Sequence, residues 1–110
     1  MRIAICDDNE IQIDIFMHRI NNFLKRNGDI KALITPYDKG QPLIDDVADG
    51  EWYDVVVLDI VLKDENGIEV AKELRLNGYN GNIIFWTAHK EYVFEALDIL
   101  PVHYIIKGSE

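Results

Sequence analysis

Four short runs of apolar residues constrain the fold of this chain more than any other feature. The runs are Ile3-Ala4-Ile5-Cys6, Val55-Val56-Val57-Leu58, Ile83-Ile84-Phe85-Trp86 and Tyr104-Ile105-Ile106. They are rich in β-branched and aromatic residues and do not alternate with polar ones, as is typical of strands covered on both faces. A more polar run, residues 31–35, stops at Pro36 and is typical of an edge strand. The pattern predicts a five-stranded parallel sheet.

The segments between these runs have helical spacing of apolar residues. One helix is expected from Asn9 to Asn27. Asp38 is a candidate N-cap for a second helix, Asn66 caps a third that ends at Gly78, and a short fourth covers residues 90–97. Alternating strands and helices predict right-handed βαβ units.

The expected fold class is therefore α/β: a flavodoxin-like, doubly wound parallel sheet with strand order 2-1-3-4-5. A barrel of eight such units needs about twice this length. Residues 1–110 are expected to form a single domain. Because only three residues follow Lys107, the helix that normally closes this architecture is expected to be absent from this chain.

Composition excludes several classes of function. The chain has 20 acidic and 11 basic residues and a net charge of −9, which argues against direct contact of this segment with nucleic acid. The single cysteine, Cys6, excludes an internal disulfide and a multi-cysteine zinc site. Neither a membrane span nor a signal peptide is expected. These features predict a soluble, cytoplasmic domain.

Polar residues follow the predicted strands at the point where each one ends. Asp7 and Asp8 follow the first, Asp59 the third, Thr87 ends the fourth and Lys107 follows the fifth. Open α/β sheets bind their ligands outside the carboxyl ends of the strands, where the winding reverses. We therefore expect these side chains to converge on one rim of the sheet.

The residue types on this rim predict a particular chemistry. Clustered carboxylates repel one another unless a cation intervenes, and an all-oxygen cluster favours Mg²⁺, which leaves positions for phosphate oxygens. An aspartate can then act as a nucleophile towards phosphorus. Lys107 and the Thr87 hydroxyl are suited to bind phosphoryl oxygens, and Ala88 leaves space beside them. The prediction is phosphoryl transfer onto an aspartate.

At this level of detail the chain resembles the receiver domain of two-component response regulators over residues 2–107. The matching motifs, in order, are Cys6-Asp7-Asp8-Asn9, Val57-Leu58-Asp59-Ile60, Asn66-Gly67-Ile68-Glu69, Trp86-Thr87-Ala88 and Tyr104-Ile105-Ile106-Lys107. The resemblance implies that Asp59 accepts a phosphoryl group from a sensor histidine kinase. The implied Mg²⁺ ligands are Asp7, Asp8, Asp59 and the backbone carbonyl of Val61.

The same resemblance implies a switch. Thr87, Ala88 and Lys107 would bind the phosphoryl group, and Tyr104 would turn inward as Thr87 moves towards it. The output surface would lie around the fourth helix and fifth strand, and phosphorylation would permit a homodimer. Residues 4–9 and 67–71 also resemble the subgroup whose receivers precede a LytTR-type DNA-binding domain, which implies control of transcription through a domain beyond Glu110.

The chain departs from the family pattern in three respects. Leu62-Lys63 stands where the family usually has Met-Pro, Gly108 where proline usually follows the lysine, and Trp86 is bulkier than usual. No departure removes a charge or hydroxyl from the predicted site, but the geometry around Lys107 is put in question.

Other interpretations remain to be weighed. Asp7 and Asp8 could simply cap the first helix. An aspartyl-phosphate phosphatase usually carries a second Asp two residues after the nucleophile, where this chain has Val61. An FMN binder needs a phosphate loop that Asp7-Asp8-Asn9-Glu10 does not provide. A receiver-like interaction domain that is never phosphorylated usually lacks one of the acids or the lysine. We therefore expect a phosphoacceptor domain rather than an enzyme.

Overall fold

A computed structural model describes residues 1–99 and 102–108 of the chain. Five strands form one parallel sheet: β1 (Arg2–Cys6), β2 (Leu33–Tyr37), β3 (Val55–Leu58), β6 (Asn82–Thr87) and β7 (Val102–Ile106). Their order across the sheet is β2-β1-β3-β6-β7, so the predicted order 2-1-3-4-5 is confirmed. The helices are α1 (Glu10–Arg26), α2 (Gly40–Ala48), α3 (Gly67–Leu76) and α4 (Val93–Ala96), the last preceded by a 3₁₀ turn, η1 (Lys90–Tyr92).

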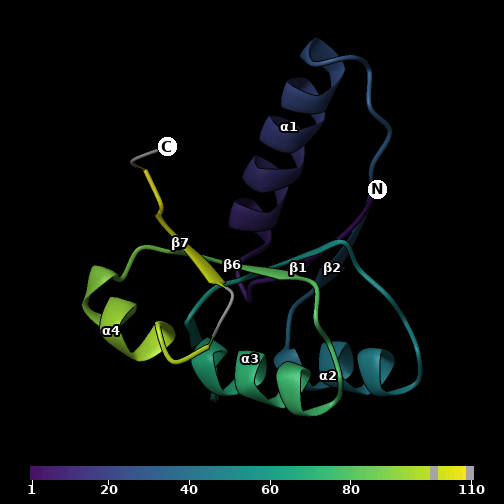
Figure 1. Ribbon diagram of the computed structural model, residues 1–110. Helices are drawn as coiled ribbons and strands as arrows, with labels where there is room; N and C mark the ends of the chain where they lie inside the picture. Colours follow the sequence, from purple (N-terminus) through teal and green to yellow (C-terminus); the bar gives the residue numbers. More distant parts are fainter. Residues whose placement is uncertain (100–101, 109–110) are drawn as a thin grey trace.

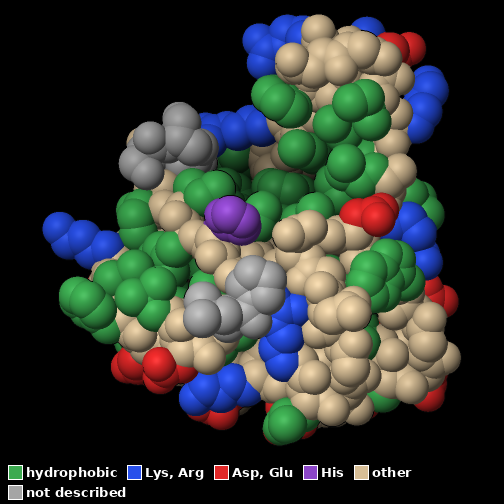
Figure 2. Space-filling view, in the orientation of Figure 1, with side chains coloured by type: hydrophobic (Ala, Val, Ile, Leu, Met, Phe, Trp, Pro, Cys, Tyr) green, Lys and Arg blue, Asp and Glu red, His purple; other side chains and the backbone are tan. Residues whose placement is uncertain are grey.

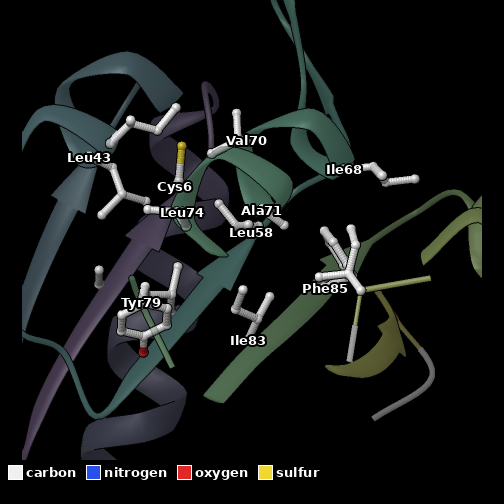
Figure 3. Packing of buried hydrophobic residues seen from close by; sticks show 14 of the residues in the cluster. Cys6, Leu43, Leu58, Ile68, Val70, Ala71, Leu74, Tyr79, Ile83 and Phe85 are labelled. Atoms are coloured by element: carbon white, nitrogen blue, oxygen red, sulfur yellow. The ribbon is translucent and has the colours of Figure 1, made fainter. Parts of the chain in front are cut away.

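The helices are distributed unequally over the two faces of the sheet. α1 covers one face, and α2, α3 and α4 cover the other (Figure 1). On the three-helix side, buried residues of β1, β3 and β6 pack against α2 and α3 through Leu43, Val70 and Leu74 (Figure 3). Among the described residues, no helix has the length and apolar character needed to span a bilayer.

The face that α1 covers is only partly closed. Phe16 of α1 packs against Trp86, with 5.6 Å between the ring centroids. Further along the same face, Ile105 of β7 is 37% exposed. A groove of about 300 Å³ lies beside α1, between Ile15 and Trp86, and Figure 2 shows apolar side chains in the hollow beside this helix. The fifth strand therefore lacks cover on this side among the described residues.

Two of the four helices, α1 and α3, have a local side-chain cap at the N-terminus. Asn9 accepts hydrogen bonds from the N–H groups of Ile11 and Gln12 and caps α1, so this role does not fall to Asp7 or Asp8. The predicted cap of α3 by Asn66 is confirmed, since its side chain accepts from the Ile68 N–H. The predicted cap of α2 by Asp38 is wrong.

The cap of α2 comes from a distant part of the chain. This helix begins at Gly40, and the preceding Lys39 makes no side-chain capping bond. Instead, Glu65 Oε1 accepts the hydrogen bond of the Gly40 N–H at 2.8 Å. Glu65 belongs to a hairpin that the sequence did not predict, formed by β4 (Val61–Leu62) and the antiparallel β5 (Glu65–Asn66).

Two predicted boundaries also need correction. β2 runs through Pro36 to Tyr37 instead of stopping before the proline. The Leu33 N–H donates to the Met1 carbonyl, and the Tyr37 carbonyl accepts the Asp7 N–H. Because backbone groups alternate along an edge strand, those of residues 34 and 36 are directed away from the sheet. Pro36 therefore needs no N–H at this position. The fourth helix, predicted over roughly residues 90–97, begins as a 3₁₀ turn and ends as α-helix at Ala96, with Leu97 as its C-cap.

Gly67, the first residue of α3, lies directly against the backbone that carries Asp59. A Cβ atom at this position would overlap the carbonyl group of Asp59, and the Gly67 N–H donates to the Ile60 carbonyl at 2.6 Å. Only glycine permits this approach, so α3 and the segment after β3 are fixed relative to each other.

Replacing Gly67 with alanine should destabilise the protein by about 1–3 kcal/mol, because α3 must move away from the Asp59 backbone. Urea denaturation measures this loss. The matched control is Glu73→Ala on the exposed side of α3, which should change the unfolding free energy by less than about 0.5 kcal/mol. Equal stability of Gly67→Ala and Glu73→Ala would contradict the close approach.

Candidate functional site

The carboxyl ends of four sheet strands place the predicted site residues on one rim. Asp7 and Asp59 directly follow β1 and β3, which pair Cys6 with Leu58. The ladder continues beyond the strands, since the Asp59 N–H donates to the Cys6 carbonyl at 3.0 Å. Lys107 follows β7, and its N–H donates to the Thr87 carbonyl at 2.7 Å. The four side chains thus start from aligned positions.

At the centre of the rim, one ammonium group joins two carboxylates. Lys107 Nζ lies 2.8 Å from Asp7 Oδ2 and 3.0 Å from Asp59 Oδ2. All three side chains are largely buried: the exposed fractions are 14% for Lys107, 2% for Asp7 and 11% for Asp59. The same nitrogen lies 5.1 Å from the centre of the Trp86 ring, a cation–π distance. Asp7 and Asp59 therefore face a common cation.

Burial and shared charge shift the pKa values in this cluster. Burial raises the pKa of Asp7, even though Lys107 and the Asn9 N–H stabilise its ionised form. Burial alone would lower the pKa of Lys107, but hydrogen bonds to Asp7 and Asp59 outweigh it and raise that pKa. A further positive charge near Asp7 would therefore stabilise its ionised form.

The two oxygens of Asp59 have different partners. Oδ2 accepts from Lys107, and Oδ1 accepts the Ile60 N–H at 2.7 Å. The residue as a whole is 9% exposed. A carboxylate held in this way has a fixed orientation at the rim of the sheet, which a nucleophile in an in-line displacement requires.

Asp8 does not join this pair in the structure. It is exposed, and its Oδ2 accepts the backbone N–H of Lys63, in the β4–β5 hairpin, at 2.7 Å. Within residues 1–99 and 102–108, no three acidic, histidine or cysteine side chains are arranged as a ready-made metal site. The structure therefore brings the side chains of Asp7, Asp59 and Lys107 together. The Asp8 side chain is instead directed to the backbone of the adjacent hairpin.

The remaining predicted residues surround one loop. Thr87 is fully buried, and its hydroxyl accepts the His89 N–H at 3.3 Å. Tyr104 is half-buried, stacks near Phe85 and donates its hydroxyl to the His89 carbonyl. Burial raises the pKa of Tyr104. The two predicted switch residues thus contact the same residue: Thr87 bonds the N–H of His89, and Tyr104 bonds its carbonyl.

Two predicted residues lie at the surface of the rim. Ala88 is exposed, and Val61 is 45% exposed at the start of β4. The backbone of Val61 pairs with that of Asn66 across the hairpin, so its position depends on this hairpin. Sequence reasoning missed Lys63 and Glu65, whose contacts hold the hairpin to Asp8 and to α2. Neither residue has a local sequence signal, because each contact joins segments far apart in the chain.

Comparisons with known proteins agree with this arrangement. The family model described as "Response regulator receiver domain" matches residues 3–110. The "Sensory transduction protein LytR" of Staphylococcus saprophyticus is 32% identical over 113 residues, which cover all of this chain and 41% of that protein. The protein of the same name from Staphylococcus haemolyticus is 40% identical over 60 residues, 54% of this chain and 23% of that protein. The chain thus spans less than half the length of these relatives.

Solved structures show the same fold. Response regulator TrrA of Thermotoga maritima, in complex with Mg(2+)-BeF, has a TM-score of 0.73 and 25% identity, covering 99% of this chain and 88% of that one. A CheY-like receiver domain from Methylobacillus flagellatus has a TM-score of 0.80 at 17% identity, covering 100% and 88%. By fold, by the residues at its rim and by the match over residues 3–110, this chain belongs to the response regulator receiver domain family.

Proposed function

We propose that Asp59 accepts a phosphoryl group from the phosphohistidine of a sensor histidine kinase, in a reaction that requires Mg²⁺. The observation that carries this proposal is the convergence of Asp7 and Asp59 on one cation, Lys107, at the rim of the sheet. The domain is thus a phosphoacceptor of signal transduction in the cytoplasm, and no catalytic turnover of an external substrate is proposed. TrrA, a response regulator of the same fold, binds Mg(2+)-BeF, which supports the proposal.

The residues at the rim fit a hard divalent cation. Asp7, Asp8, Asp59 and the Val61 carbonyl supply only oxygen atoms, and burial raises the pKa of Asp7 despite its bond to Lys107. When bound, Mg²⁺ would neutralise the charge of the incoming phosphoryl group. An Asp59 carboxylate oxygen forms the new bond to phosphorus while the bond from phosphorus to the histidine nitrogen breaks. The imidazole leaves with that electron pair and takes up a proton.

Lys107 and Thr87 provide the response to the new group. The phosphoryl group adds nearly two negative charges next to Lys107, which is already within reach of Asp59. The Thr87 hydroxyl accepts the His89 N–H and can donate its own hydrogen to a phosphoryl oxygen, so a movement of Thr87 towards the phosphoryl group would pull on the segment at His89. Because Tyr104 holds the carbonyl of the same residue, the loop and the tyrosine must rearrange together. Ala88 leaves room beside the group.

The rearranged surface would be the output of the domain. Phe94 and Leu97, in and next to α4, are 81% and 52% exposed. An apolar surface next to the switch loop is suited to a second copy of the domain or to an effector. Since the relatives named LytR are more than twice as long as this chain, we propose a DNA-binding output domain beyond Glu110 that controls transcription. The acidic segment itself would not contact nucleic acid.

We also propose that the receiver domain continues past Glu110 into the helix that closes this fold. The support is the incompletely covered face beside α1, where Trp86 lines a groove and Ile105 is exposed. A helix packed there would cover Ile105, fill the groove that Trp86 lines and complete the second layer.

The first prediction concerns the acceptor. Incubation with Mg²⁺ and phosphoramidate should add the mass of one phosphoryl group to the wild-type chain and none to Asp59→Asn, which keeps the shape of the side chain but lacks the nucleophilic oxygen. Intact-mass spectrometry measures the adduct. Asp98→Asn, a change at an exposed aspartate, serves as the control and should be modified like the wild type. An adduct on Asp59→Asn would assign the acceptor to another residue.

A second prediction concerns the charge at the rim. Lys107→Met should lower the unfolding free energy by about 3 kcal/mol, because two buried carboxylates lose their cation. Saturating Mg²⁺ should restore more stability to this variant than it adds to the wild type, since the ion supplies the missing positive charge. Urea denaturation with and without MgCl₂ tests this, with the exposed Lys90→Met as control. Equal Mg²⁺ effects in Lys107→Met and the wild type would count against the shared cation site.

A third prediction concerns the uncovered face. The coding sequence that follows Glu110 should specify an amphipathic helix of about three turns, whose apolar stripe matches the face formed by Trp86 and Ile105. Sequencing the gene past this codon provides the check. A stop codon or a run of polar residues at that point would contradict the proposed continuation.

A further inference from the structure

The contact between Asp8 and Lys63 has a consequence for cation binding. Lys63 stands where the family usually has proline, which has no N–H, and here the Lys63 amide donates to Asp8 Oδ2 at 2.7 Å. We propose that the backbone amide of Lys63 competes with the divalent cation for Asp8. The bond between Asp8 and the Lys63 amide is thus a latch that lowers the affinity of the site for Mg²⁺ and breaks when the ion binds, while the hairpin stays in place. The inference rests on the proposed function, in which Mg²⁺ binds at Asp8 and Asp59.

The position of Asp8 is the first support for competition. Asp7 and Asp59 already share Lys107, but Asp8 forms no part of that cluster, and the described residues contain no preassembled group of three metal ligands. Its carboxylate is exposed and directed to the hairpin amide. Binding of the same ion as Asp59 would draw the Asp8 carboxylate away from this amide and towards the cluster of Asp7 and Asp59. On this proposal, the hydrogen bond is lost when the cation is gained.

The hairpin itself is held in place without Asp8. Leu62 is 5% exposed and belongs to the main core, which anchors one strand of the hairpin. Glu65 anchors the other strand through its bond to the Gly40 N–H of α2. Release of Asp8 therefore leaves the Val61 carbonyl in position and returns only the Lys63 amide to water. The cost of opening the latch is one solvent-exposed hydrogen bond, which corresponds to a change in affinity of about three- to tenfold.

The turn of this hairpin allows a sharp experiment. Asp64 has φ = 64° and Lys63 has no positive φ, as in a type II turn, where proline is favoured at the first central position. Lys63→Pro therefore removes the amide hydrogen and is compatible with the turn. Lys63→Ala is the matched control, because it removes the same charged side chain and keeps the N–H. The difference between the two variants isolates the amide.

Isothermal titration calorimetry, in which MgCl₂ is added to each variant, gives the dissociation constants for Mg²⁺. Lys63→Pro should bind Mg²⁺ about three- to tenfold more tightly than Lys63→Ala. Equal affinities would overturn the proposal, and so would weaker binding by Lys63→Pro, which would make the amide an orienting partner of Asp8. These outcomes differ from failure of the proposed function, in which the wild-type chain itself would not bind Mg²⁺.

A measurement on the unsubstituted chain complements the variants if Lys63→Pro does not fold. Hydrogen exchange of the Lys63 amide, followed by nuclear magnetic resonance, should accelerate when MgCl₂ is added, since Asp8 no longer accepts its proton. The Gly40 amide, which is bonded to Glu65, should keep its protection and serves as an internal control. Unchanged or greater protection of the Lys63 amide in Mg²⁺ would overturn the latch.

Discussion

The bond of Lys107 to both Asp7 and Asp59 is the interaction on which the rest of the rim depends. Two carboxylates that contact one nitrogen lie no more than about 6 Å apart, and both are largely buried. Two ionised carboxylates this close repel each other, and a cation between or beside them offsets the repulsion. The fold provides that cation from the last described strand, so the sheet must be assembled up to β7 before the site exists.

This arrangement explains why a domain of this kind can respond to phosphorylation. Lys107 is a cation on a flexible stem, held by charges rather than by tight packing, and it can follow a change in the charge of Asp59. The buried Thr87 and the half-buried Tyr104 meet at His89, one on the N–H and one on the carbonyl. A change at the acid cluster can therefore reach α4 through a single peptide segment.

The sequence predicts the position of the site better than the direction of its side chains. Parallel strands end at one edge, so the residues after each apolar run were correctly assigned to the same rim, as Asp7, Asp59 and Lys107 show. The orientation of Asp8 depends on the Lys63 amide in a hairpin of two residues per strand, which has no periodic signal. The cap of α2 by Glu65 is equally invisible, because local capping rules search only the neighbouring residues.

Taken together, the long-range contacts make the hairpin the element that links the acid cluster to the helical layer. The Lys63 amide in its turn bonds to Asp8, and Glu65 in its second strand caps α2. Gly67, which directly follows the hairpin, lies against the Asp59 backbone. The hairpin therefore joins Asp8 to α2, and Gly67 joins the Asp59 backbone to α3. Sequence variation in residues 61–66 can thus change the surroundings of Asp8 and Asp59 without changing either carboxylate.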